Sequence, residues 1–338
     1  MKQLRVIVLA FFLLAAASAA FADGLTDAWR AFVQPAVTPE QYTATYHYHQ
    51  ARERAINPLV AIPPGKRSMP EVTALGYFHL RDFQYNNARD SFEYALKHNN
   101  KDPLLRYLFA STKAILLVTE PEKMQEQGKG VIEEFKRLSG RDPNNAMPLI
   151  QAASVAFDCN RIDLALPLIN EALKKPEFRF YQVPLPDKLD ESPVQSAKAW
   201  WWVQAELWNE MVSRTANCTR GLLQRASRHS LAGDPKRADE LYQQAVQVAA
   251  LLTRTSPANA DAAFTGLELE RQTLLAQSTS PGVSQPPAGQ LAKIEAAQRE
   301  LERKWRELQA QEQAQPPVSV EERLAHQKSL LEAALAGL

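Results

Sequence analysis

The stretch ALGYFHLRDFQYNNARDSFEYALKHNNKDP, from Ala74 to Pro103, decides the fold of this chain. Its pattern is that of two short helices joined by a turn. In the second helix, Ala88, Phe92 and Ala95 are separated by four and then three residues, so all three lie on one face. The two alanines allow the first helix to come close, and Phe92 fills the space between the helices. The segment Asn99–Pro103 then ends the pair, because proline breaks a helix.

The same pattern recurs twice further along the chain. A second copy begins near Asp142 and a third near Gly233. The interval from Ala88 to Ala165 is 77 residues, and that from Ala165 to Ala238 is 73 residues. Each interval is about twice a repeat of roughly 34 residues, with a few residues inserted. One further, degenerate repeat is therefore expected in each interval.

The chain resembles the tetratricopeptide-repeat family. The positions that match are Leu75, Gly76, Ala88, Phe92 and Ala95, then Ala152, Ala153, Ala165, Ile169 and Ala172, then Ala238, Tyr242 and Ala245. The resemblance covers roughly Gln41 to Gln277 and implies an all-α solenoid of helix pairs over residues 23–277. It is specific for fold and unspecific for function, because the family is a scaffold that many systems use.

The resemblance also implies a place where partners bind. In this family, the first helix of each pair lines a concave groove that accepts a peptide or helix from another protein. The corresponding outward positions are Tyr77 and Arg81 in the first clear copy, and Ser154 and Asp158 in the second. We therefore expect a non-catalytic protein–protein interaction scaffold with a protein partner.

The N-terminal residues 1–22 have the pattern of a secretory signal peptide. Lys2 and Arg5 precede an uncharged apolar run, and small residues before Asp23 fit a cleavage site near Ala22. The run is shorter than the roughly 20 apolar residues of a membrane span, so cleavage is expected, with an uncleaved anchor as the alternative. No later stretch is long and apolar enough to span a bilayer. The pattern predicts a periplasmic or secreted protein, and suits a bacterium best.

The composition favours helices and gives no sign of nucleic-acid binding. Removing Lys2 and Arg5 from the 39 basic residues leaves 37 against 38 acidic ones, a net charge of −1. A protein that binds nucleic acid would be expected to carry a basic excess. The chain has only 12 glycines and no run of alternating β-branched residues bounded by turns, which favours helices over sheets.

The sequence contains none of the common catalytic or cofactor-binding motifs. Glycine-rich nucleotide loops, nucleophile elbows, HExxH and CxxC are all missing, so we expect no enzyme, no cofactor and no metal. His47 and His49 are the one metal-like pair. Residues two apart on a helix point in different directions, so these two histidines are not expected to share an ion.

A segment rich in proline and aromatic residues separates the second copy from the third. Four prolines in Pro176–Pro193 predict an extended loop, and a long helical pattern follows it. The aromatic residues of segment 178–208, with Trp200, Trp201, Trp202 and Trp208 among them, suggest a pocket for a small ligand or a glycan. Core packing is the favoured interpretation. Three consecutive tryptophans cannot all point inward on a helix, so at least one is expected to be exposed or covered by the loop.

Cys159 and Cys218 are the only cysteines. In an exported chain they can form one disulfide, and the alternative is two buried free thiols. A bridge would close a loop of 59 residues. The sequence leaves both possibilities open, because it does not place the two Cα atoms within bonding reach.

The C-terminal part of the chain has a different character. Residues 278–290 form a linker rich in serine, proline and glycine, and residues 291–338 form an amphipathic helical tail. Apolar residues of the tail recur at three- and four-residue steps. This pattern fits either a short coiled coil or a helical hairpin that packs on the end of the repeats.

Overall fold

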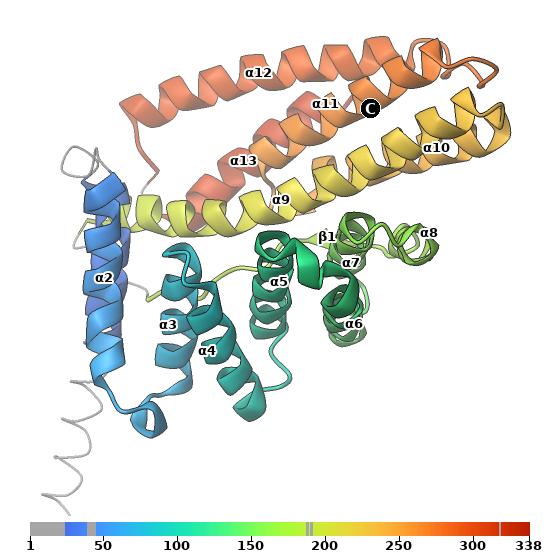
Figure 1. Ribbon diagram of the computed structural model, residues 1–338. Helices are drawn as coiled ribbons and strands as arrows, with labels where there is room; N and C mark the ends of the chain where they lie inside the picture. Colours follow the sequence, from blue (N-terminus) through green and yellow to red (C-terminus); the bar gives the residue numbers. More distant parts are fainter. Residues whose placement is uncertain (1–23, 39–44, 187–188, 190–191, 318) are drawn as a thin grey trace, which may run out of the picture. The chain divides into compact units, whose positions relative to one another are not determined.

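The computed structural model describes residues 24–38, 45–186, 189, 192–317 and 319–338 (Figure 1). Helices dominate this part of the chain, and its two β-strands have only two residues each. The expected all-α class is therefore confirmed. The expected signal peptide, residues 1–22, lies outside the described residues.

The elements follow one another along the chain mostly as helices joined by short turns and loops. A helix at 24–37 precedes α2 (Thr45–Ala61), η2 (Pro64–Lys66), α3 (Met69–Arg81), α4 (Tyr85–His98), α5 (Pro103–Thr119), η3 (Pro121–Lys123), α6 (Met124–Arg141), α7 (Met147–Asp158) and α8 (Ile162–Ala172). The chain continues through β1 (Phe178–Arg179), α9 (Pro193–Leu231), α10 (Pro235–Leu251), η4 (Leu252–Arg254), β2 (Thr255–Ser256), α11 (Ala260–Thr279), α12 (Gln290–Ala314) and α13 (Val320–Leu335).

The chain divides into two compact units. Unit 1 takes in the described residues up to Thr112 together with Val183–Val203. Unit 2 takes in Lys113–Gln182 and Gln204–Leu338. Within the units, helices adjacent in the sequence pack against each other, as α3 does with α4, α6 with α7, α7 with α8, and α10 with α11. This arrangement of packed neighbouring helix pairs is compatible with a helical repeat.

Three helix pairs share one kind of turn. Phe83, Asn160 and Gly233 each take a left-handed backbone conformation, with φ of 61°, 55° and 79°. In each turn the next residue donates its backbone N–H to the carbonyl five residues earlier, at 2.7–2.9 Å, which ends the first helix in the same way. Each left-handed residue precedes the first alanine of its second helix (Ala88, Ala165 or Ala238) by five positions. The three copies seen in the sequence therefore have equivalent local geometry.

The matching side chains lie at the contacts between helices. All nine second-helix positions of the three copies are fully buried; they are Ala88, Phe92, Ala95, Ala165, Ile169, Ala172, Ala238, Tyr242 and Ala245. In the first copy, α3 approaches α4 so closely that a Cβ added at Gly76 would lie 2.7 Å from Cε1 of Phe92. This close approach explains why glycine stands at this position of α3.

Ala165 gives a direct test of this register. Its methyl group is fully buried in α8, so Ala165→Leu forces extra volume into a packed helix interface. We expect the free energy of unfolding to fall by about 1–3 kcal/mol in urea denaturation. The matched control is Ala292→Leu on the exposed side of α12, where the change should stay within about 0.5 kcal/mol. Equal stability of the two variants would show that the register is wrong.

Aromatic side chains form the core at the start of unit 1. Phe32 stacks on Phe78 with ring centroids 4.6 Å apart, and Trp29 meets Phe78 edge-on at 4.7 Å. The helix at 24–37 is therefore held on α3 by ring contacts, in addition to the area that they bury. A hydrogen bond adds a second link in this unit, because His49 Nδ1 of α2 lies 2.8 Å from Oδ1 of Asp82.

The last three helices share a core of their own. Apolar residues of α12 and α13 pack on α11, and the buried members are Ala260, Ala263, Leu267, Leu274, Ile294, Ala297, Leu301, Leu308, Leu330, Leu331 and Ala334. Of the two arrangements left open for the tail, the structure has the helical hairpin packed on the preceding helix (Figure 1). Residues of the expected linker are tied to neighbouring helices, because Ser230 Oγ donates to Pro281 O at 3.1 Å and Gln277 Nε2 donates to Ser284 O at 3.0 Å.

Across the described residues, none of the helices combines the length and the apolar character needed to cross a lipid bilayer.

Candidate functional site

The aromatic loop after α8 is fixed by two polar residues that precede α7. The side chain of Asn145 binds the backbone of Arg179 on both sides: its Oδ1 accepts from Arg179 N and its Nδ2 donates to Arg179 O, each at 2.9 Å. The loop then pairs with the chain after α10, because β1 and β2 form a parallel pair with Phe178 opposite Thr255. The extended conformation expected for this segment is confirmed for its first part, and it is built by contacts 34 residues apart in the sequence.

Asp142 completes this anchor with its carboxylate. It accepts hydrogen bonds from Asn145 Nδ2 at 2.9 Å, from Arg179 at 2.6 Å and from Tyr181 OH at 3.0 Å. Burial raises the pKa of Tyr181 well above its usual range, and the negative charge of Asp142 raises it further. The Tyr181 phenol therefore stays protonated and donates to Asp142. Asp142 and Asn145 both lie where the sequence pattern predicts the start of a repeat. The sequence therefore predicts a turn at these residues, but not their hydrogen bonds to the loop after α8.

The tryptophans expected in an aromatic pocket take part in packing. Trp208 is fully buried, donates its Nε1–H to Tyr181 O at 2.9 Å and lies 6.2 Å from the ring of Phe180. In unit 1, the ring of Trp202 lies 5.5 Å from that of Phe32. Trp200, Trp201 and Trp202 are all half-buried, as their consecutive positions on a helix require. These contacts agree with the favoured interpretation, core packing, for Trp208.

Two of the four residues expected to face a partner are buried, which corrects their expected exposure. Tyr77 is fully covered and donates its hydroxyl proton to Val203 O at 3.0 Å, and Ser154 is only 1% exposed. Each of these two residues lies on the first helix of its pair, and that helix is covered on this face as well as on the face that packs against the second helix. The side chains of both residues are therefore packed inside their units. Arg81 is half-buried with its guanidinium 5.1 Å from the centre of the Tyr77 ring, and Asp158 is exposed. Asp158 is thus the exposed member of the set, and Arg81 is partly covered.

Of the two states that the sequence left open for the cysteines, the structure has two buried free thiols. Cys159 packs against α6, where its Sγ lies 3.5 Å from Met124 O and a Cβ added at Gly128 would lie 2.3 Å from that sulfur. Cys218 is fully buried in α9. Burial raises the pKa of both thiols, and the charge of Asp158 raises both further. Both cysteines are therefore protonated and unreactive in the folded chain.

Thiol titration checks this state. Unfolded in denaturant without reductant, the protein should give two thiols per chain with a disulfide-exchange reagent. In the folded protein the same reagent should react slowly with both, because neither sulfur is accessible as a thiolate. If no thiols reacted in the unfolded, unreduced chain, the two cysteines would be joined by a disulfide and the free-thiol assignment would be wrong.

His49 pairs with carboxylates in a way that does not build a metal site. Its Nδ1 lies 2.8 Å from Asp82 Oδ1 and its Nε2 lies 3.5 Å from Glu53 Oε1. The hydrogen bond to Asp82 raises the pKa of His49, and the negative charge of Asp82 raises it further. His47 stands in the first turn of α2, and its side chain lies outside the described part. Among the described residues, no three histidine, cysteine or acidic side chains come together as metal ligands.

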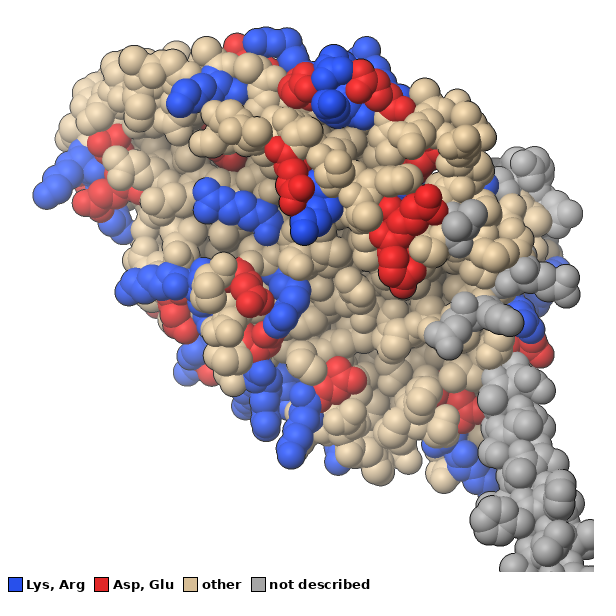
Figure 2. Space-filling view, turned by 180° about the vertical axis from the view of Figure 1, so that it is seen from behind, with Lys and Arg blue, Asp and Glu red and all other residues tan. Residues whose placement is uncertain are grey.

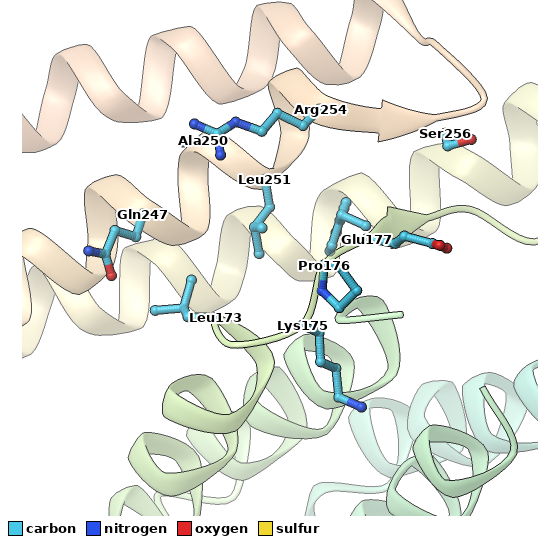
Figure 3. Close-up of a pocket in the computed structure, with 10 residues that line it drawn as sticks. Leu173, Lys175, Pro176, Glu177, Gln247, Ala250, Leu251, Arg254 and Ser256 are labelled. Carbon is cyan, nitrogen blue, oxygen red and sulfur yellow. The ribbon is translucent and has the colours of Figure 1, made fainter. Parts of the chain in front are cut away.

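Unit 2 has a cavity with polar groups at its edge. It has a volume of about 550 Å³ and lies between the end of α8, the loop that leads to β1, and the end of α10 (Figure 3). The lining residues are Leu173, Lys175, Pro176, Glu177, Phe178, Gln247, Ala250, Leu251, Arg254 and Ser256. Small-molecule sites in proteins are typically about 300–1,000 Å³, so this cavity is large enough to hold a ligand.

No sequence motif marks this cavity. Its walls come from two segments about 75 residues apart, and the loop that Asp142 and Asn145 anchor carries part of one wall. The one signal in the sequence is the proline-rich insertion itself, because a long irregular segment between repeats is often functional. That signal points to the loop, but it does not indicate the residues of α10 and η4 that line the other side of the cavity.

Comparison with known proteins gives no further assignment: neither the protein-family models nor the curated proteins that were searched match this chain. Functional inference therefore depends on the geometry of these side chains.

Proposed function

We propose that this chain is a non-catalytic protein–protein interaction scaffold of the tetratricopeptide-repeat type, exported to the bacterial envelope or secreted. The observation that supports it is the repeated turn at Phe83, Asn160 and Gly233, each followed after five residues by a buried alanine. Helix pairs of this kind stack on their neighbours and present an extended face to a partner. The N-terminal pattern of Lys2 and Arg5 followed by an apolar run supports export.

Of the residues expected to face a partner, Arg81 in unit 1 and Asp158 in unit 2 are the two that are not fully buried. Arg81 offers a positive charge to a partner of unit 1, and Asp158 offers a negative charge to a partner of unit 2. On the face that Figure 2 shows, basic and acidic side chains lie interspersed. Such a surface gives no reason to expect attraction to nucleic acid.

Site-specific photocrosslinking tests this proposal. A photoreactive residue replaces Arg81 or Asp158 in the chain expressed with its N-terminus, and a matched control replaces Glu93 on the exposed side of α4. We expect the same partner protein to be captured from both groove positions and not from Glu93. Capture that is equal at all three positions, or that fails at both groove positions, would contradict a partner-binding groove on the first helices.

The alternative is a small-ligand or glycan-binding protein that uses segment 178–208. The buried indole of Trp208 and the contact of Trp202 with Phe32 give these aromatic side chains a packing role, and this favours the scaffold. A glycan fragment that changes the tryptophan fluorescence of the folded protein would favour the alternative.

A further inference from the structure

We propose that the cavity between α8 and α10 binds a small carboxylate with an aliphatic body. This is an activity beyond the proposed scaffold function, since it uses second helices and the inserted loop. It is inferred from three properties of the cavity: the apolar residues on one side, an arginine at its edge that has no hydrogen bond or ion pair among the described residues, and the local balance of charge.

One side of the cavity is apolar, and polar side chains form the rest. Leu173 enters it from the residue after α8, Leu251 enters it from the end of α10, and Pro176 borders it from the loop (Figure 3). Phe178, which is buried, lines it as well. An aliphatic chain of a few carbons would bury its surface against these side chains, at roughly 25 cal/mol for each Å² removed from water.

Two polar side chains of the cavity have unused hydrogen-bonding capacity. Arg254 is exposed and has no hydrogen bond or ion pair within the described residues, and the same is true of Gln247. In Figure 3 the guanidinium of Arg254 extends back along α10 towards Ala250, on the side where Gln247 lies. A guanidinium can hold a carboxylate through two parallel hydrogen bonds, and a nearby amide can add a third donor.

The other charged residues at the cavity point elsewhere. Lys175 Nζ donates to Pro143 O at 2.5 Å, and Glu177 lies 3.4 Å from the guanidinium of Arg179. In Figure 3 both side chains turn away from α10. Arg254 is therefore the charged group that a ligand would meet, which selects an anion.

The charge of Arg254 is only partly balanced by its own surroundings. The acid whose charge acts on it is Glu270 of α11, which is 6% exposed. Burial raises the pKa of Glu270 to about 7, and the positive charge of Arg254 opposes this rise. At neutral pH this carboxyl is ionised only in part, so a ligand carboxylate can still pair with Arg254.

The experiment is a titration of the full-length protein with hexanoate, followed by NMR of methyl-labelled leucines. We expect saturable shifts of the Leu173 and Leu251 methyl signals. Hexanamide lacks the charge, so it should bind at least about tenfold more weakly, because a charge-assisted hydrogen bond contributes more than the 1.4 kcal/mol that corresponds to tenfold. Acetate lacks the aliphatic body, so it should bind more weakly as well, because it buries less apolar surface. An N-acetylated tripeptide that ends in leucine tests whether the cavity instead binds the C-terminal carboxylate of a peptide.

Two variants and one control locate the site. Arg254→Gln should weaken hexanoate at least about tenfold, and Ala250→Leu should weaken it by narrowing the cavity. Arg237→Gln is the matched control, because it removes one arginine from α10, the helix that precedes η4, where it is paired with Glu240. Melting curves show that each variant is folded.

The proposal is overturned if hexanoate shifts neither leucine, if hexanamide binds as well as hexanoate, or if Arg254→Gln binds as well as Arg237→Gln. Binding of the tripeptide without binding of hexanoate overturns it as well. None of these results bears on crosslinking at Arg81 and Asp158, so the scaffold proposal fails or stands separately.

Discussion

Replacing Phe92 with alanine should lower the free energy of unfolding by about 3–5 kcal/mol, the range for truncation of a buried aromatic side chain. Phe92 is fully buried between α3 and α4, and its ring lies where a Cβ at Gly76 would be only 2.7 Å away. The ring packs directly against Gly76 of α3, so its removal leaves a cavity between the two helices. Urea denaturation followed by helical circular dichroism measures the change.

A second phenylalanine of the same helix pair is the control. Phe83 is 71% exposed at the turn between α3 and α4 and takes a left-handed φ of 61°. Its replacement by alanine removes almost no buried surface, so the change should stay within about 0.5 kcal/mol. If Phe92→Ala proved no more damaging than Phe83→Ala, the helix pair would not be packed around Phe92.

The close packing between Phe92 and Gly76 can also be tested by changing Gly76. Gly76→Ala should destabilise the parent protein, because the new methyl group meets the Phe92 ring. In a Phe92→Leu background the same change should be less harmful. Gly130→Ala on the open side of α6 meets nothing within 4 Å and should stabilise by about 1 kcal/mol, as alanine does in an exposed helix.

The repeat pattern predicted the local structure well because local structure depends on nearby residues. The four-and-three spacing of small and large residues fixes which face of a helix is buried, and the nine second-helix positions are all buried as expected. The turns at Asn160 and Gly233 also suit their conformation, because asparagine and glycine tolerate positive φ. Phe83 shows that the turn geometry persists even where the residue does not favour it.

Features that depend on distant segments were not predictable. Tyr77 and Ser154 were expected on an open face, but burial on both sides of a first helix depends on which segments cover it, and the repeat pattern does not contain that information. The two cysteines were likewise undecided until their surroundings were known. The cavity is made by residues about 75 positions apart, and its unpaired arginine belongs to η4, a three-residue helix that no pattern marks.

The buried carboxyl of Glu270 should make the folded protein less stable as the pH rises. Burial raises the pKa of this group from 4.5 to about 7. Between those two values the folded chain binds more protons than the unfolded chain, so the free energy of unfolding falls by up to about 1.4 kcal/mol per pH unit. From pH 4.5 to pH 7 this amounts to about 3 kcal/mol, all of it lost above the pKa of the folded state.

Glu270→Gln removes this dependence, because the amide stays neutral at every pH. We expect the variant to be more stable than the parent by up to about 3 kcal/mol at pH 8, less whatever attraction to Arg254 the carboxylate supplied. At pH 4.5 the two proteins should unfold at nearly the same urea concentration. Glu126→Gln on the exposed side of α6 is the control and should leave the pH profile unchanged. A Glu270→Gln variant that is less stable than the parent at pH 8 would mean that the ionised carboxylate is held by Arg254 more strongly than burial opposes it.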